Sequence, residues 1–237
     1  MKLRINCIIL FLLFFISAIS AQESQKLIAL TFDDGPNTTT TPAVLAKLNK
    51  HQIKASFFVI GDRITDESAL FMKVAHDMGC EVCNHSYTHS HMDKQSREVN
   101  LQEIEKTSKL IEDITGEAPK YFRAPYIDIN REMYDYIDLT FIWGEDCQDW
   151  DSSYSAEYRA ETELRKARDG GIILMHDFNG NSQTVEALDI LIPSLKQQGY
   201  RFVTLTELFK QKGVQPKRGI LYSHADDTEM YFTKSSN

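Results

Sequence analysis

The sequence predicts an α/β fold in which parallel strands are covered by helices. From Leu27 onward, short apolar runs alternate with segments of helical periodicity, and such alternation produces a parallel sheet, either open or closed into a barrel. No low-complexity linker and no sequence repeat interrupts this pattern. The 237 residues are 42% hydrophobic and 25% charged, which is typical of a globular domain and excludes collagen-like or coiled-coil chains. We therefore expect a single large domain with a substantial hydrophobic core.

Seven apolar runs have the length and the bounding residues of buried strands. They span residues 27–32, 55–60, 81–84, 121–123, 140–143, 171–175 and 201–204. A further strand-like piece, 219–222, falls in an otherwise polar C-terminal tail.

The segments between the strands have helical patterns. They span residues 41–51, 67–78, 96–115, 130–137, 156–168, 183–198 and 206–212. Thr41 and Pro42 predict an N-cap followed by proline at the first helical position, and Gly79 and Gly116 mark helix ends. An apolar stripe predicts the buried face of the longest helix: Val99, Leu101, Ile104, Leu110, Ile111 and Ile114.

The first 21 residues have the pattern of a secretion signal peptide. Lys2 and Arg4 precede an unbroken apolar run at 7–16, and small residues follow. A bilayer span takes about 20 apolar residues, so this run is too short for an anchor, and no second long run occurs. We expect cleavage after Ser20 or Ala21 and export to the periplasm, the cell envelope or the extracellular space.

The chain is acidic, with 26 basic and 34 acidic residues and a net charge of −8. This balance argues against nucleic-acid binding, which needs a basic surface to neutralise phosphates. Of the four cysteines, Cys7 lies in the predicted signal, which leaves Cys80, Cys83 and Cys147. Because three is an odd number, at least one thiol is free or pairs between molecules. We interpret the Cys80 and Cys83 pair as packed thiols rather than a metal or redox motif.

Five of the predicted strands run directly into clusters of reactive side chains. These clusters occupy residues 33–36, 85–89, 123–126, 146–150 and 174–177. In parallel α/β folds, catalytic residues gather at the carboxyl ends of the strands. The five clusters are therefore expected to converge on one site.

His85 and His89 indicate a divalent metal site. On an extended strand they would stand about 13 Å apart, whereas one helical turn would bring their Cβ atoms to about 6 Å, which suits two Zn–N bonds of about 2.1 Å. We therefore expect a helical turn here. Either Asp33 or Asp34 would supply the third ligand, and its neighbour would stay free as a base, because the metal offsets the repulsion between the adjacent carboxylates.

Arg123 and His176 are expected to serve the same site. Arg123 would pair with the free aspartate and orient it. Asp149 would accept a hydrogen bond from the His176 ring and raise its pKa, which makes His176 a usable proton donor.

Other polar and aromatic residues have weaker patterns. Asp146 is interpreted as a cap or turn residue. Trp150 offers a flat face for stacking on a sugar, although an isolated tryptophan more often packs in a core. His91 and His224 lie in polar contexts and are interpreted as surface residues, with His91 of interest because it lies two positions past the histidine pair.

Taken together, these motifs resemble the polysaccharide deacetylases of carbohydrate esterase family 4, which share the NodB-homology domain. The five motifs of that family match, in order, residues 31–36, 84–89, 123–126, 146–150 and 172–177. The resemblance implies a distorted (β/α)7-type barrel. It divides the chain into a signal peptide at 1–21, a NodB-like domain at 22–212 and a tail at 213–237.

The resemblance also implies the site's division of labour. Asp34, His85 and His89 would bind the divalent metal, usually zinc, with cobalt, nickel or iron as alternatives. Asp33 would then be the catalytic base.

The remaining roles follow from the same motifs. Arg123 would hold Asp33, and Asp149 would tune His176 as the acid. The residues implied in binding the oxyanion, the acetyl group and the sugar are Tyr126 (through its backbone N–H), Pro125, Trp150 and Leu174.

The function expected from these features is metal-dependent removal of N-acetyl groups from a polysaccharide that contains N-acetylglucosamine, such as peptidoglycan or a chitin-type oligosaccharide, with release of acetate. An O-acetyl esterase on xylan and a catalytically silent saccharide-binding protein are alternatives. Phosphoryl transfer through an aspartate is a third, but it needs a phosphate-binding lysine or glycine-rich loop and Mg²⁺ rather than paired histidines. The expected partner is an acetylated polysaccharide, and we expect a monomer without a membrane span after cleavage.

Overall fold

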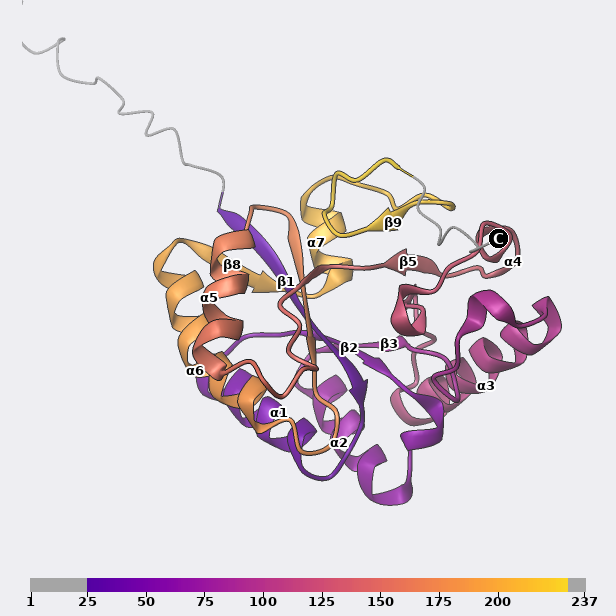
Figure 1. Cartoon of the computed structure of the whole chain (residues 1–237), viewed down its shortest axis with the longest axis horizontal. Helices are drawn as coiled ribbons and strands as arrows, with labels where there is room; N and C mark the ends of the chain where they lie inside the picture. Colours follow the sequence, from indigo (N-terminus) through magenta and orange to yellow (C-terminus); the bar gives the residue numbers. More distant parts are fainter. Residues whose placement is uncertain (1–24, 230–237) are drawn as a thin grey trace, which may run out of the picture.

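A curved, all-parallel sheet forms the centre of the protein in a computed structural model that describes residues 25–229 (Figure 1). The strand order is β6-β7-β1-β2-β3-β4-β5-β9, and β8 pairs with β1 beside this path. The predicted α/β barrel is thereby confirmed as a distorted, partly closed (β/α)7-type barrel in a single domain.

The strands agree closely with the apolar runs of the sequence. Their bounds are β1 Lys26–Gly35, β2 Ser56–Val59, β3 Glu81–Asn84, β4 Tyr121–Phe122, β5 Thr140–Ile142, β6 Glu145–Asp146, β7 Gly171–His176, β8 Tyr200–Val203 and β9 Leu221–Tyr222. The short strand β6 lacks an apolar run of its own, which is why the sequence pattern does not predict it.

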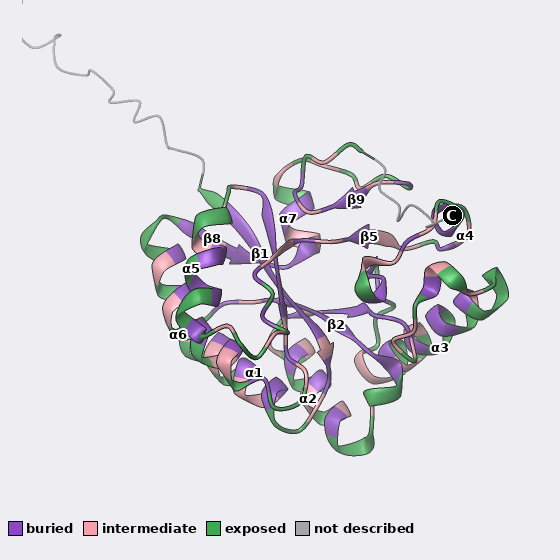
Figure 2. Ribbon diagram, in the orientation of Figure 1, coloured by how far each residue is buried: buried purple, intermediate pink, exposed green. Residues whose placement is uncertain are grey.

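Seven α-helices occur in the described part of the chain. Their bounds are α1 Thr40–His51, α2 Asp66–Asp77, α3 Arg97–Thr115, α4 Met133–Tyr136, α5 Ala156–Lys166, α6 Ser182–Gln197 and α7 Leu205–Gln211. Helices cover the outside of the sheet, and Figure 2 shows that their outward surfaces are exposed while the strands are largely buried. None of the helices within residues 25–229 is long and apolar enough to cross a membrane.

The alternation of side chains along β1 explains how the core and the site share one strand. Even-numbered residues pack against the outer helices: Ile28, Leu30 and Phe32. Odd-numbered residues point to the inside of the barrel: Leu27, Ala29, Thr31 and Asp33. Because successive strand residues alternate between faces, the interior row is apolar at the start of β1, where α7 packs, and polar at its carboxyl end.

The segment after α7 extends the sheet. Strand β9 pairs with the edge strand β5, and Ile172 of β7 donates its backbone N–H to the Ser223 carbonyl at 3.0 Å. Residues 221–224 therefore bridge β5 and β7. The interpretation of His224 as a surface residue is wrong: its side chain is buried and its Nε2 contacts the Asp169 carbonyl oxygen at 2.7 Å.

Helix α1 begins at Thr40, two residues before the predicted first helical residue Pro42, and Thr41 is not its N-cap. Asn37 supplies the capping oxygen instead, because its Oδ1 accepts the backbone N–H groups of Thr39, Thr40 and Thr41. The Thr41 hydroxyl is thereby free to donate to Asp177 Oδ2 at 2.5 Å.

The apolar stripe predicted for α3 is only partly the buried face. Val99 is exposed, whereas the buried residues are Asn100, Glu103, Ile104, Thr107 and Ile111. These positions recur at helical spacing, but three of them are polar, and one of these, Glu103, supports the histidine loop described below.

The three cysteines of the described chain are free and buried. Cys80 and Cys83 lie in different hydrophobic clusters, as expected for residues three apart along a strand. Burial raises the pKa of the Cys80 thiol to about 11 and raises those of Cys83 and Cys147 as well. The burial of Cys80 and Cys83 as free thiols agrees with their interpretation as packed side chains.

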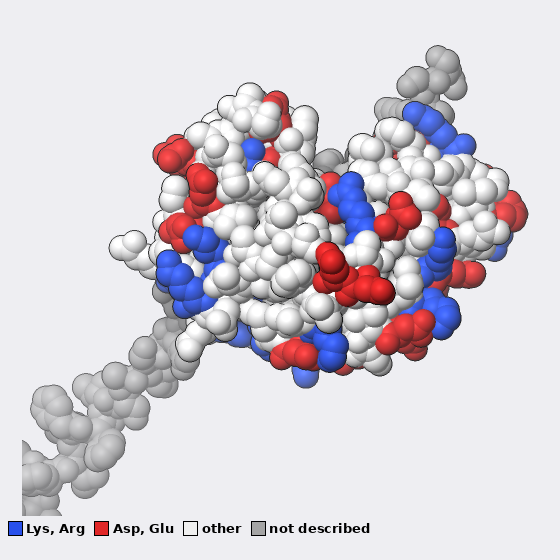
Figure 3. Space-filling model, turned by 90° about the horizontal axis from the view of Figure 1, so that it is seen from below, with Lys and Arg blue, Asp and Glu red and all other residues white. Residues whose placement is uncertain are grey.

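Acidic and basic side chains are interspersed on the face shown in Figure 3. That face carries no extended basic patch, in keeping with the acidic composition of the chain.

The position of β9 predicts that Tyr222 is a stability determinant. Its side chain is 2% exposed and packs edge-on against Phe209 at 5.0 Å between ring centroids. Tyr222→Ala should lower the free energy of unfolding by about 3–5 kcal/mol. Leu70→Ala, a control at a 65% exposed position, should change it by less than about 0.5 kcal/mol. Chemical denaturation measures both, and a loss below about 1 kcal/mol for Tyr222→Ala would contradict this packing.

Candidate active site

Asp33 and Asp34 lie at an irregularity near the carboxyl end of β1. The register between β1 and β2 shifts between Asp33 and Gly35, and Asp34 has a left-handed backbone with φ of 73°. Neighbouring strand residues normally face opposite sides, but a bulge re-aims them. Both carboxylates consequently approach the same imidazole: Asp33 Oδ2 is 3.7 Å and Asp34 Oδ1 is 3.5 Å from His85 Nε2.

The two histidines lie on a tight irregular loop, so the predicted helical turn is wrong. Backbone N–H groups of this loop donate to side chains instead of to a helix: Tyr87 and Thr88 donate to Glu103 Oε2 at 2.8 and 2.7 Å. The loop still brings the rings of His85 and His89 to 5.0 Å between centroids. Glu103 on α3 is therefore a supporting residue that the apolar stripe did not reveal.

Asp34, His85 and His89 form a group that fits a divalent metal. Asp34 Oδ1 lies 3.1 Å from His89 Nε2, and one nitrogen or oxygen atom from each of the three residues lies within 4.8 Å of the others. Asp34 Oδ1 is also a buried atom without a hydrogen-bond partner. Two imidazoles and a carboxylate are suitable ligands for zinc and similar ions.

Neighbouring groups orient these ligands. His85 Nδ1 lies 2.7 Å from the Arg123 carbonyl oxygen and must donate its N–H to it, which leaves Nε2 as the nitrogen free to bind a metal. His89 Nδ1 contacts the Tyr126 hydroxyl at 3.2 Å. Burial raises the pKa of Asp34, but the two imidazoles beside its carboxylate outweigh this effect and hold that pKa well below its usual range.

Arg123 lies directly beside Asp33 at the carboxyl end of β4. Its Nη1 donates to Asp33 Oδ1, and its Nη2 donates to Thr31 Oγ1 at 2.9 Å. Its guanidinium also lies over the Phe58 ring at 4.1 Å. The arginine is fully buried, so it fixes the Asp33 carboxylate through a charge-assisted hydrogen bond in a site with little solvent.

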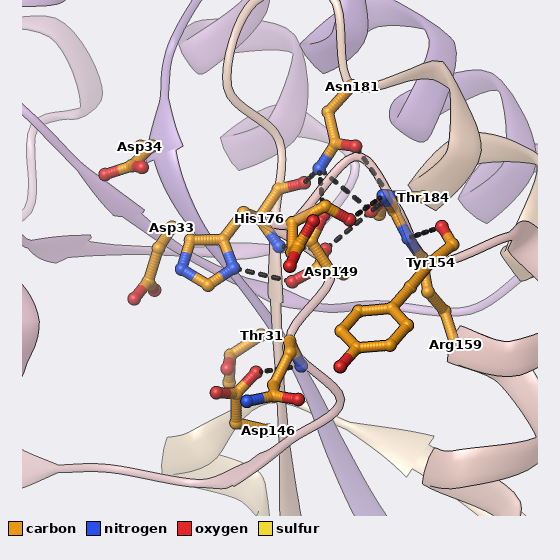
Figure 4. Close-up of polar contacts among 12 residues, drawn as sticks. Thr31, Asp33, Asp34, Asp146, Asp149, Tyr154, Arg159, His176, Asn181 and Thr184 are labelled. Carbon is orange, nitrogen blue, oxygen red and sulfur yellow. Dashed lines mark hydrogen bonds and ion pairs between the residues drawn. The ribbon is translucent and has the colours of Figure 1, made fainter.

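Asp149 holds His176 on the other side of the site (Figure 4). The His176 Nδ1 lies 2.6 Å from Asp149 Oδ1, and the His176 backbone N–H donates to Asp149 Oδ2 at 2.8 Å. Burial lowers the pKa of His176, but the charge and hydrogen bond of Asp149, together with the charges of Asp33 and Asp34, raise it to about 9.

Of the predicted substrate-binding residues, two present exposed aromatic rings and two are buried. Tyr126 and Trp150 are 57% and 54% exposed, whereas Pro125 and Leu174 are buried. The more common core role for an isolated tryptophan is therefore wrong for Trp150. Asp146, interpreted from the sequence as a cap or turn residue, is the last residue of β6, and its Oδ1 accepts the Gln148 backbone N–H at 2.6 Å in the turn that follows.

His91 stacks on the Tyr126 ring at 4.1 Å between centroids, and its Nδ1 hydrogen-bonds Asp128 Oδ2 directly. With Asp93, these residues form a second group of possible ligand atoms. Ligands of one zinc with bonds of about 2.1 Å stand more than 3 Å apart, so the direct His91–Asp128 contact describes a hydrogen-bonded pair at the rim of the site.

Several buried polar residues behind His176 were not identified from the sequence. Thr184 and Asn181 contact Asp149, and Arg159 contacts both of them (Figure 4). Thr184 and Arg159 lie on helices whose patterns were correctly predicted. The sequence pattern did not reveal that these residues are buried, because polar residues on a helix are ordinarily assigned to its solvent-exposed face.

Asp177 is another buried carboxyl that the sequence did not explain. Burial, with the nearby charges of Asp33 and Asp34, raises its pKa to about 7 despite the Thr41 hydrogen bond. Its side chain fills the space beside Gly35, where a Cβ would lie 2.7 Å from Asp177 Oδ2. Gly35 is thus required for this close approach beneath the aspartate pair.

The family model for polysaccharide deacetylase matches residues 20–140. The chain is 50% identical over 194 residues to a bifunctional xylanase/deacetylase of Pseudobutyrivibrio xylanivorans, covering 82% of this chain and 32% of that protein. It is 39% identical over 191 residues to the peptidoglycan-N-acetylglucosamine deacetylase PgdA of Listeria monocytogenes, covering 80% of this chain and 40% of that protein.

Among solved structures, a family 4 acetyl xylan esterase from Clostridium thermocellum, in complex with a cobalt ion, is 41% identical with a TM-score of 0.82, covering 85% of this chain and 100% of that one. The chain therefore belongs to the polysaccharide deacetylases of carbohydrate esterase family 4, a family of deacetylating hydrolases. It spans about a third of the xylanase/deacetylase and two fifths of the Listeria protein.

The Asp149–His176 pair predicts a measurable titration. In metal-free protein, His176 should titrate with a pKa near 9. Asp149→Asn should lower that pKa, because the negative charge that offsets the effect of burial is removed. A raised histidine pKa stabilises the fold fully below the unfolded value of about 6.5. The stability advantage of wild type over Asp149→Asn should therefore diminish as pH rises through about 9. NMR titration and denaturation at several pH values test this, and an unshifted pKa in the variant would refute it.

Proposed function

We propose that the protein is a divalent-metal-dependent hydrolase that removes acetyl groups from an acetylated polysaccharide, with N-acetylglucosamine polymers as the first candidate. The observation that carries this proposal is that Asp33 and His176 both lie beside the candidate metal triad, each held by a different buried residue. Arg123 holds Asp33, and Asp149 holds His176. A base and an acid beside one electrophilic centre are what amide hydrolysis requires.

Asp33 is proposed as the base. Arg123 occupies Asp33 Oδ1, which leaves Oδ2 directed toward His85 at 3.7 Å. A carboxylate held in this way can accept a proton from an attacking water without first being reoriented. The backbone N–H of Tyr126 is proposed to stabilise the oxyanion, a contribution typically worth about 3–4 kcal/mol for a well-placed donor.

His176 is proposed as the acid. Its Nδ1 is occupied by Asp149, so the proton for the leaving group must come from Nε2. An amine leaves poorly unless it is protonated, and an imidazolium stabilised by a carboxylate is suited to supplying that proton.

Asp34, His85 and His89 are proposed to hold zinc, with cobalt, nickel or iron as alternatives. When bound, the ion supplies Lewis-acid chemistry, because it polarises the acetyl carbonyl and increases the acidity of water. The chain's own contribution is to fix the ligand atoms through the hydrogen bonds of the two Nδ1 atoms.

Removal of O-acetyl groups from xylan is the second candidate. It is favoured by the likeness to the xylanase/deacetylase and to the acetyl xylan esterase. Trp150 and Tyr126 present exposed rings near the site, and an aromatic face can stack on either kind of sugar.

Export is proposed as well. The predicted signal peptide at residues 1–21 lies outside the described residues, and a protein acting on peptidoglycan or xylan must meet its polymer beyond the cytoplasm.

Acetate release tests the proposed function. Metal-loaded protein should release acetate from at least one of peptidoglycan, chitooligosaccharide and acetylxylan, and the preferred substrate decides between N- and O-deacetylation. Asp33→Asn should keep its metal but lose more than about 100-fold in kcat, because general base catalysis contributes roughly 10²–10⁴-fold. Release from none of the three by metal-loaded wild type would favour a silent saccharide-binding protein, and an active Asp33→Asn variant would remove Asp33 as the base.

A further inference from the structure

Arg159 is a buried cation whose hydrogen bonds lead toward the proposed acid. It projects from α5, is 1% exposed, and has no carboxylate within ion-pair distance among residues 25–229. Its Nε donates to the Tyr154 carbonyl at 3.0 Å and its Nη2 to the Asp151 carbonyl at 3.1 Å. Burying an arginine without an ion pair is costly, so its remaining partners need an explanation.

Those partners are two side chains that also contact Asp149 or His176. Arg159 Nη1 donates to Asn181 Oδ1 at 2.7 Å and to Thr184 Oγ1 at 3.0 Å. Asn181 Nδ2 donates to the His176 carbonyl at 2.9 Å and to Thr184 Oγ1 at 2.9 Å. Figure 4 shows Arg159, Asn181 and Thr184 lying together on the side of Asp149 away from Asp33 and Asp34.

Arg159 and two backbone carbonyls set the direction of the hydrogen bonds in this network, because Asn181 Nδ2 also donates to the carbonyl oxygens of Asp149 and His176. A guanidinium only donates, so the Asn181 amide must turn its oxygen toward Arg159 and its nitrogen toward Thr184. The Thr184 oxygen then accepts from both Arg159 and Asn181. Its single proton is left to donate to Asp149 Oδ2, at 2.5 Å.

Asp149 is consequently surrounded by donors. Its Oδ2 accepts from the Thr184 hydroxyl and from the His176 backbone N–H, and its Oδ1 faces His176 Nδ1 at 2.6 Å. Because the Thr184 hydroxyl donates to Oδ2, the Asp149 carboxylate is the acceptor in each of these hydrogen bonds. His176 must therefore carry its proton on Nδ1, and Nε2 is the nitrogen left for exchange with substrate.

We propose that Arg159 is a positioning residue for the acid His176. It acts through Thr184 and Asn181 to fix which atom donates and which accepts in each hydrogen bond between α5 and His176. Its catalytic consequence rests on the proposed deacetylase function, but its effect on the His176–Asp149 hydrogen bond does not. Arg159 touches neither the candidate metal ligands nor Asp33 in any described contact. Its loss should therefore change turnover rather than metal content or substrate affinity.

The test compares Arg159→Met and Thr184→Val with Arg165→Met, a control that removes an exposed arginine from the same helix. Arg159→Met and Thr184→Val should each lower kcat by about 10-fold or more, with KM within about twofold and the metal content of wild type. Arg159→Lys, which keeps a donor and a charge, should recover part of the loss. Because the two residues act in series, the double variant should lose no more than the worse single variant.

A second measurement is independent of activity. In ¹⁵N-histidine-labelled protein, the low-field proton of the His176 Nδ1–H···Asp149 hydrogen bond, assigned with His176→Gln, should be present in wild type and Arg165→Met. It should be shifted or lost in Arg159→Met and Thr184→Val. If the protein is inactive on every substrate, this signal still decides the inference.

Retention of both kcat and this signal in Arg159→Met would overturn the proposal, as would additive losses in the double variant. If Arg159→Met does not fold, Thr184→Val and Arg159→Lys decide the matter. Wild-type turnover and an unchanged signal in Thr184→Val would then contradict the proposed chain.

Discussion

The left-handed backbone of Asp34 within β1 is the constraint on which the candidate site depends. Strand β1 pairs with β2 and β7 up to the aspartate pair, so its carboxyl end is held on both sides. On a regular strand, one member of the aspartate pair would face the outer helices. The bulge turns both carboxylates toward His85, and Asp177 packs beneath the turn beside Gly35. One aspartate can then serve a metal while its neighbour stays with Arg123.

Each reactive group is held by a buried partner from a different element. Glu103 on α3 fixes the histidine loop, Arg123 after β4 fixes Asp33, and Asp149 fixes His176. Buried polar groups must be satisfied if they are not to destabilise the fold. The hydrogen bonds of Glu103, Asp33 and Asp149 offset the cost of burying these carboxylates and also position the reactive groups at the carboxyl end of the barrel.

The sequence predicted the elements better than the contacts between them. Apolar runs and helical periodicity located the main strands and helices, and the rule that parallel strands end together placed Asp33, His85 and His176 near one another. Prediction from the sequence failed where tertiary contacts override the local sequence pattern. The loop at 85–89 is not helical because Glu103 takes its N–H groups, and Arg159 was unremarkable in sequence because its burial depends on packing between α5 and α6.

The division of labour between the two aspartates is the central claim, and metal binding tests it most directly. Purified wild type, Asp33→Asn and Asp34→Asn should be titrated with Zn²⁺ by calorimetry under identical conditions. Wild type and Asp33→Asn should each bind one equivalent at the triad with similar affinity, whereas Asp34→Asn should lose at least about 10-fold in affinity, because it replaces a charged ligand by a neutral one. Equal binding by Asp34→Asn, or loss of binding in Asp33→Asn alone, would contradict the assignment.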